Sequence, residues 1–226
     1  MSTLILLHGA IGAKDQLERF IPELQENYNQ VIALNFPGHG GTPIPAEGLS
    51  IPFLSNGLVN YLQDHALEEV DVFGYSMGGY VALHAAAQSN RFRKILTLGT
   101  KFSWSPEIAA KEKGMLNPDK LKEKVPAFAQ ALEKRHAPQN WEDVLHATAR
   151  LMEGLGQQPA LTSAHLESLN CKVLISVGDR DTMVSIDESL HVYRQITNAH
   201  FAVLPGVVHP IEKVPVTEVQ RLLQLF

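Results

Sequence analysis

The feature that most constrains the fold is a series of six short apolar runs separated by amphipathic segments. Each run is continuously apolar, which is typical of strands that are buried on both faces of a parallel sheet. The predicted strands cover residues 4–7, 31–36, 70–75, 94–99, 172–177 and 200–204. The predicted helices cover residues 14–26, 51–65, 77–88, 186–197 and 216–225. This alternation predicts an α/β fold, with a mostly or wholly parallel sheet of about six strands flanked by helices.

One long interval of the chain lacks a predicted strand and carries helix signals instead. Asn117 precedes a proline and Asn140 precedes an acidic first turn, as helix N-caps commonly do. Gly154 and Gly156 predict the end of the second of these helices. The interval is too long for a loop, so we predict an inserted helical cap. The expected division is a core of residues 1–100 and 171–226 with a cap of residues 101–170.

Composition excludes several classes of protein. The chain has 226 residues and a net charge of −5, and its Lys and Arg residues are not clustered as a nucleic-acid surface requires. No apolar run approaches the roughly 20 residues of a membrane-spanning helix. The single cysteine, Cys171, opens an apolar strand and is expected to be a core residue. We therefore expect a cytoplasmic protein that acts on a small molecule, without a membrane or nucleic-acid partner.

The sharpest motif is Gly-Tyr-Ser-Met-Gly over residues 74–78, where a predicted strand meets a predicted helix. A serine at such a tight turn presents its hydroxyl group, and the strained backbone requires small neighbours such as Gly74 and Gly78. The amides that begin the helix favour developing negative charge nearby. The motif predicts that Ser76 is a nucleophile. The alternative is a tight turn with an incidental serine.

A serine nucleophile needs a base, and the base needs an acid. His209 follows the last predicted strand, so it lies at the same carboxyl edge of the sheet as Ser76. Asp179 and Asp181 both follow the preceding strand and lie at that edge too. Their spacing leaves both open as the acid. The resulting order of serine, aspartate and histidine is the one found in one class of serine hydrolases.

The other histidines are expected to have structural roles. His39 lies in a glycine-rich turn, which we place near the rim of the pocket. Six further histidines fall within helical patterns and are expected to be surface or packing residues: His65, His84, His136, His146, His165 and His191. No His-x-x-x-His pair occurs, so neither a zinc site nor a cofactor is expected.

Four separated motifs resemble those of the α/β-hydrolase superfamily, in the same order and over essentially the whole chain. They are Leu-His-Gly-Ala at residues 7–10, Phe-Pro-Gly-His-Gly at 36–40, the serine motif at 74–78, and Gly178-x-x-Asp181 with His209. The resemblance implies that Asp181 is the acid, because the family places it three residues after the glycine. It also implies a sheet with strand order 4-3-5-6-7-8 in the family's scheme, here without the antiparallel hairpin that usually precedes it.

The resemblance further implies an oxyanion hole made by two backbone N–H groups, those of Ala10 and Met77. In the same pattern, His8 shapes the loop that presents Ala10. A serine at position 76 excludes the aspartate-based mechanisms of haloalkane dehalogenases and epoxide hydrolases. The expected reaction is cleavage of a carboxylic ester or thioester through an acyl-enzyme on Ser76, with His209 as general base and acid.

Alternatives with the same catalytic residues remain open. They are carbon–carbon bond hydrolysis, acyl transfer and a small-molecule receptor of the same fold. The serine motif also resembles that of menaquinone-pathway lyases, but Tyr80 stands where those carry an arginine for an anionic substrate. Specificity is expected to come from apolar cap residues: Phe102, Trp104, Met115, Phe128, Trp141 and Met152. Among these, Phe102, Trp104, Phe128 and Trp141 are the predicted pocket residues, and some of the six are expected only to pack the cap onto the core.

Overall fold

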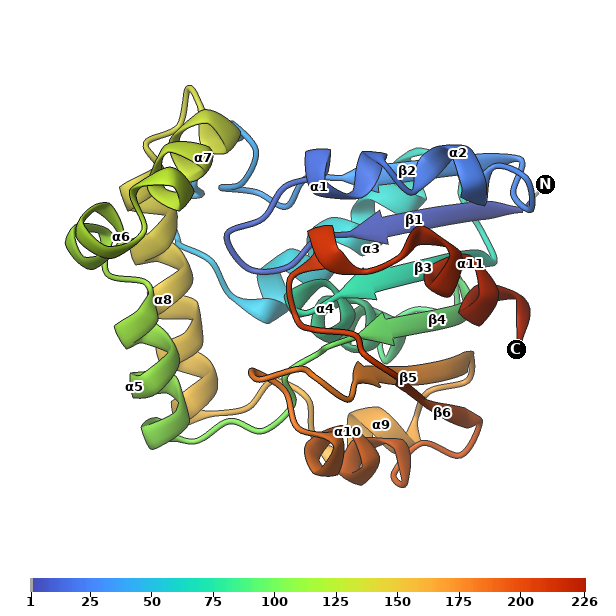
Figure 1. Ribbon diagram of the computed structural model, residues 1–226. Coiled ribbons are helices and arrows are strands. Elements are labelled where there is room, and N and C mark those ends of the chain that lie inside the picture. The colour runs from blue at the N-terminus through green and yellow to red at the C-terminus, as the bar shows by residue number, and fades with distance from the viewer. Residues whose placement is uncertain (1) are drawn as a thin grey trace.

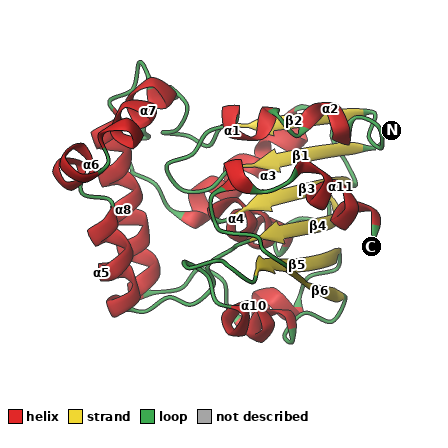
Figure 2. Cartoon of the chain, in the orientation of Figure 1, coloured by secondary structure: helices red, strands yellow, loops and turns green. Residues whose placement is uncertain are grey.

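A computed structural model describes residues 2–226 and contains one six-stranded sheet (Figures 1 and 2). The strands are β1 (Thr3–Leu7), β2 (Gln30–Leu34), β3 (Val70–Tyr75), β4 (Phe92–Leu98), β5 (Lys172–Gly178) and β6 (Ala199–Leu204). They lie in the order β2-β1-β3-β4-β5-β6, and every neighbouring pair is parallel. The predicted α/β fold with six parallel strands is therefore confirmed, together with its strand order.

Successive residues of each strand pack into different layers. Leu4 and Leu6 belong to a layer with the helices α1 (Asp15–Glu18), α2 (Ile21–Leu24) and α11 (Val216–Gln224). Ile5 and Leu7 belong to the opposite layer, with α3 (Ile51–Asp64), α4 (Met77–Ala86) and α10 (Ile186–Tyr193). Both faces of the sheet are thus covered, which explains why the strands are continuously apolar instead of alternating.

The single helix predicted over residues 14–26 is wrong. The segment forms two short helices, α1 and α2, and Pro22 lies in the first turn of the second. A proline has no N–H to donate to the carbonyl four residues earlier, and its ring clashes with that carbonyl. Pro22 therefore cannot continue the helix that contains Glu18, and the chain starts a new turn instead.

Between β4 and β5 the chain forms five helices, α5 (Pro106–Met115), α6 (Pro118–Lys124), α7 (Pro126–His136), α8 (Trp141–Gln157) and α9 (Ser163–Glu167). Asn117 and Asn140 cap α6 and α8 as predicted, since their side chains accept hydrogen bonds from the amides of Lys120 and Glu142. The predicted end of α8 is wrong, because the helix continues through Gly154 and Gly156 to Gln157. A Cβ at position 156 would lie 2.5 Å from the Cβ of Ala109, so this glycine allows α8 to pack closely against α5.

The arrangement in space places four of these helices over one edge of the sheet. In Figure 1 the strand arrows point toward α5, α6, α7 and α8, which lie beyond the carboxyl ends of the strands, whereas α9 lies beside α10. Residues of α7 and α8 form a small apolar cluster with Leu116, which directly follows α5: Leu116, Ala129, Leu132, Trp141, Leu145 and Ala149. Leu121 of α6 packs against this cluster. The loops that follow the strands therefore meet this helical layer at the sheet edge. None of the helices in residues 2–226 is long and apolar enough to span a membrane.

Candidate active site

The turn between β3 and α4 holds Ser76 in an unusual backbone conformation. Its φ is 51° and its ψ is −119°, which a non-glycine residue rarely adopts and which costs of the order of 1–3 kcal/mol. The backbone is held on both sides. The amide of Ser76 donates to Leu98 O at 2.9 Å, and the hydroxyl of Thr100 donates to Ser76 O at 2.9 Å. Such strain persists only where surrounding contacts enforce it.

The glycines around Ser76 are required by close contacts between backbones. A Cβ at position 74 would lie 2.5 Å from the Cα of Gly79, and one at position 78 would lie 2.4 Å from the carbonyl oxygen of Leu7. In both cases the atom in the way belongs to the backbone and cannot rotate aside. Gly74 and Gly78 therefore let α4 begin directly against β3 and β1, which aims its first turn at the sheet edge.

His209 and Asp181 form a hydrogen-bonded pair. His209 Nδ1 lies 2.7 Å from Asp181 Oδ2, while Asp181 Oδ1 accepts bonds from the amides of Met183 and Val184 at 2.8 and 2.9 Å. Burial alone would raise the pKa of Asp181, but the hydrogen bond and charge of His209, with the two amides, hold that pKa below its usual value. The carboxylate is thus fixed and ionised, and His209 Nδ1 carries the proton that joins the pair.

Asp179, the other candidate acid, has a different partner. Its Oδ1 accepts a hydrogen bond from the amide of Gly206 at 2.6 Å, in the turn that follows β6. Gly206 has a φ of 74°, a left-handed conformation that glycine adopts readily, so Asp179 stabilises a tight turn. The structure therefore brings Asp181, and not Asp179, to His209.

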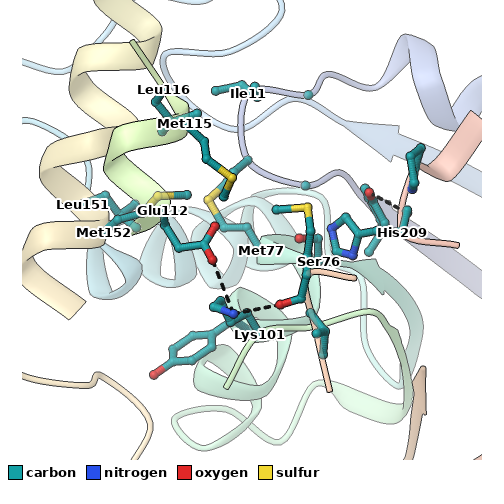
Figure 3. A pocket seen from close by; sticks show the side chains of 18 of the residues that line it. Ile11, Ser76, Met77, Lys101, Glu112, Met115, Leu116, Leu151, Met152 and His209 are labelled. Carbon is teal, nitrogen blue, oxygen red and sulfur yellow. Dashed lines mark hydrogen bonds and ion pairs between the residues drawn. The ribbon is translucent and has the colours of Figure 1, made fainter. Parts of the chain in front are cut away.

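Ser76 and His209 line the same pocket, which has a volume of about 320 Å³. Figure 3 shows them on one side of it, opposite Met115, Leu116 and Met152 from the overhanging helices. Within residues 2–226 the hydroxyl of Ser76 forms no hydrogen bond with His209. Hydrogen bonds between a nucleophile and its base are often long before substrate binds.

Two backbone amides at the pocket have no acceptor. Ala10 and Met77 both line it, and among the described residues neither donates its N–H in a hydrogen bond. Met77 is the first residue of α4, where the helix offers unpaired N–H groups and the positive end of its dipole. Ala10 and Met77, the oxyanion donors that the family resemblance implies, therefore line the same cavity as Ser76.

His8 and His136 hold the loop that carries Ala10. His8 Nε2 accepts the amide of Phe36 at 3.1 Å, so its Nδ1 carries the proton and donates to Gly9 O at 2.7 Å. His136, at the end of α7, accepts the amide of Gly40 at Nδ1 and donates from Nε2 to Ile11 O at 3.0 Å. The segment around Ala10 is thus fixed by one histidine from the sheet and one from the overhanging helices.

His39 does not lie at the pocket rim, so that prediction is wrong. It is fully buried between His8 and His136, with ring centroids 5.2 and 5.8 Å away. Its Nδ1 donates to Pro37 O, whereas its Nε2 is buried without a partner. The turn over residues 37–41 folds inward under the overhanging helices, which explains the burial. Burial lowers the pKa of His39 to about 4.

The apolar wall of the pocket differs in part from the prediction. Trp104 and Phe128 line it, together with Met115 and Met152. Phe102 and Trp141 do not, which corrects the prediction for these two. Phe102 packs toward Tyr80 with ring centroids 6.2 Å apart, and Trp141 is buried in the apolar cluster that α7 and α8 share. Which face of a helix or loop meets the pocket depends on packing that the sequence pattern does not encode.

Four charged side chains at the pocket were missed by sequence reasoning: Lys101, Glu112, Arg135 and Glu212. A signal existed only for Lys101, which closely follows β4 at the carboxyl edge of the sheet, where sites form in parallel folds. Glu112 and Arg135 lie on helices with ordinary surface patterns. Their orientation toward the cavity follows from the packing of α5 and α7.

Comparisons with known proteins agree with the geometry. A family model described as alpha/beta hydrolase fold matches residues 2–125, just over half of the chain. A probable alcohol acetyltransferase of Cyberlindnera fabianii is 33% identical over 81 residues, which are 35% of this chain and 22% of that protein. The chain matches less than a quarter of the length of its curated relatives.

Solved structures resemble the chain over nearly its whole length. A putative lipase of Acinetobacter baumannii has a TM-score of 0.78 at 22% identity, over 98% of this chain and 80% of that one. A structure from a study of carboxylesterases of Nitrososphaera gargenis has a TM-score of 0.80 at 17% identity, over 99% and 89%. At these identities the likeness establishes the fold.

The buried His39 predicts that the protein loses stability in mild acid. The unfolded chain binds a proton near pH 6.5 that the folded chain accepts only near pH 4, so stability is complete above about pH 6.5 and falls below it. The free energy of unfolding is measured by urea denaturation at pH 7.5 and pH 5.0. Between these two pH values it should fall by about 2 kcal/mol more in wild type than in His39→Gln. The control is His191→Gln, which removes an exposed histidine from α10. Equal losses in wild type and His39→Gln would contradict the prediction.

Proposed function

The chain belongs to the alpha/beta hydrolase family, and on that premise we propose that it is a serine hydrolase for a carboxylic ester or thioester of a small molecule. One observation carries the proposal. Ser76 and His209 line one pocket, and His209 is bonded to Asp181 at 2.7 Å. The amides of Ala10 and Met77 lie at the same pocket without acceptors. A nucleophile, a base held by an acid, and two oxyanion donors together suit acyl transfer.

The acylation step follows from these positions. Ser76 Oγ attacks the carbonyl carbon, and its proton passes to His209 Nε2, which can accept it because the ring proton is on Nδ1, bonded to Asp181. Asp181 holds the tautomer and stabilises the imidazolium. The carbonyl oxygen becomes negative and accepts hydrogen bonds from the amides of Ala10 and Met77. His209 then gives its proton to the departing alcohol or thiol, leaving an acyl-enzyme on Ser76.

In deacylation, water takes the place of Ser76 as the nucleophile and Ser76 becomes the leaving group. A water molecule attacks the acyl carbon while His209 takes its proton, and Ser76 recovers that proton as the acid product leaves. If an alcohol attacks in place of water, the same site performs acyl transfer. The curated relative named as a probable alcohol acetyltransferase supports this second outcome. Measuring ester formation in the presence of an added alcohol distinguishes the two.

We further propose that α5–α8 form the cap that sets specificity. They supply Met115, Phe128, Leu151 and Met152 to the pocket wall, whereas α9 packs against the sheet. The cap is anchored where His136 bonds to Ile11 O. An inserted lid of this kind excludes water and completes the pocket above a fixed site.

Replacing the nucleophile should abolish turnover. In Ser76→Ala, kcat for 4-nitrophenyl esters should fall by a factor on the order of 10⁶. The variant should still unfold in the same cooperative transition as wild type. A fluorophosphonate should label wild type once and leave Ser76→Ala unlabelled. Ser103→Ala removes an exposed serine outside the pocket and is the control. More than a few per cent of residual activity in Ser76→Ala would mean that another group is the nucleophile.

The two candidate acids form a matched pair. Asp181→Asn should lower kcat by about 10⁴, because His209 loses the partner that sets its tautomer. Asp179→Asn keeps an oxygen that can accept the amide of Gly206, so its kcat should stay near that of wild type. The measurement is the kcat of both variants on one short ester. The larger loss in Asp179→Asn would reverse the assignment.

Aromatic side chains in the pocket wall should matter only for long acyl chains. Trp104→Ala and Phe128→Ala should lose binding of octanoate esters by about 0.8 kcal/mol for each methylene no longer buried, with acetate esters nearly unaffected. Trp141→Ala is the control, because Trp141 is buried in the cap without lining the pocket. The measurement is kcat/KM from acetate to octanoate. Equal losses at every chain length in Trp104→Ala and Phe128→Ala would assign both residues to stability alone.

A further inference from the structure

Two ion pairs lie in the wall of the otherwise largely apolar pocket. Lys101 Nζ is 3.4 Å from Glu112 Oε1, and Arg135 Nη2 is 3.7 Å from Glu212 Oε1. Figure 3 shows Glu112 reaching from the helix at the left toward Lys101, which lies below Met77. Apart from His209, these four are the titratable charged side chains of the described residues that line the pocket. Their formal charges cancel, so the pocket is electrically balanced.

Lys101 brings a positive charge to the wall of the pocket that Ser76 and His209 also line. Its ammonium donates to Met183 O at 2.8 Å, which fixes it to the loop that also binds Asp181. The side chain is 18% exposed. An ammonium in this position would attract an anionic substrate if no carboxylate balanced it.

Glu112 supplies that carboxylate from the cap. It lies on α5 with a side chain that is 6% exposed, and among the described residues its ion-pair partner is Lys101. Removing a carboxylate from water is costly, and buried ion pairs add little net stability on average. Stability therefore gives little reason to place Glu112 there. Its evident effect is to cancel the charge of Lys101 within the pocket.

We propose that the pocket selects uncharged esters over anionic ones, and that Glu112 determines this selectivity by neutralising Lys101. The inference rests on the proposed serine hydrolase function and adds the charge class of its substrate. An anionic substrate must give up its hydration in an apolar cavity where each cation already has a carboxylate beside it. An uncharged ester meets no such penalty.

The test compares two esters of similar size, 4-nitrophenyl pentanoate and 4-nitrophenyl hemisuccinate. Wild type should prefer the pentanoate by about tenfold or more in kcat/KM, because the carboxylate of the hemisuccinate finds no free cation. Glu112→Gln should raise kcat/KM for the hemisuccinate by about tenfold, since it exposes the Lys101 charge. The same variant should change the pentanoate value by less than about threefold.

Two further variants show whether the gain acts through Lys101. The double variant Lys101→Met with Glu112→Gln should lose the gain on hemisuccinate. Glu153→Gln is the matched control, because Glu153 pairs with Lys113 on the same cap outside the pocket. It removes the same charge from α8 and should leave the ratio of the two esters unchanged.

Several outcomes would overturn the inference. They are equal use of both esters by wild type, an unchanged ratio in Glu112→Gln, or an equal shift in Glu153→Gln. If Glu112→Gln does not fold, the wild-type ratio still decides the selectivity. Failure of the proposed function looks different, since wild type would then hydrolyse neither ester and Ser76 would resist a fluorophosphonate.

Discussion

The site depends on one backbone constraint, the left-handed conformation of Ser76 between β3 and α4. Glycines at positions 74 and 78 remove the side chains that would otherwise push α4 away from β3 and β1, since an added Cβ would lie 2.5 Å from Gly79 Cα and 2.4 Å from Leu7 O, respectively. The helix therefore starts directly at the sheet edge, with its first amide beside the serine. The proposed nucleophile and one of the two proposed oxyanion donors depend on that arrangement, because the hydroxyl, the amide of Met77 and the helix dipole all meet at this turn.

Around this turn, the loops are held by side chains from distant parts of the chain. His8 ties the loop after β1 to the start of the loop after β2, and His136 ties both loops to the end of α7. Ile11, which directly follows Ala10, has a φ of 52°, an unusual conformation for a non-glycine residue. The bond of its carbonyl oxygen to His136 helps to hold this loop, and with it the amide of Ala10. The cap thus contributes to the geometry of the proposed oxyanion hole as well as to the pocket wall. The ion pairs of Lys101 with Glu112 and of Arg135 with Glu212 also link the proposed cap to the core.

Buried charge is used differently at the two ends of the sheet. Near the amino ends of the strands, Asp71 is fully buried and accepts bonds from Tyr28 and from two guanidinium nitrogens of Arg93. Both carboxylate oxygens of Asp71 are hydrogen-bonded, so we assign this network to the stability of the fold. At the carboxyl ends, Lys101 and Arg135 have carboxylate neighbours at 3.4–3.7 Å in an open pocket. These carboxylates neutralise the two cations that line the pocket, which is why we assign the pairs to substrate specificity.

The sequence alone determined the class of fold and the main positions of the site. Continuous apolar runs require two covered faces, and strand ends place Ser76, His209 and two aspartates at one edge. These features depend on local composition and order along the chain.

What the sequence pattern left open or got wrong depends on contacts between distant segments. The choice of Asp181 came from family resemblance, and the structure shows its bond to His209. The burial of His39, the absence of Phe102 and Trp141 from the pocket, and the pairing of Lys101 with Glu112 follow from how the helices pack over the sheet edge. Only tertiary packing decides which side of a helix faces a cavity. Residues a few positions apart in the sequence lie on different sides of a helix, and the sequence order alone does not say which side meets the cavity.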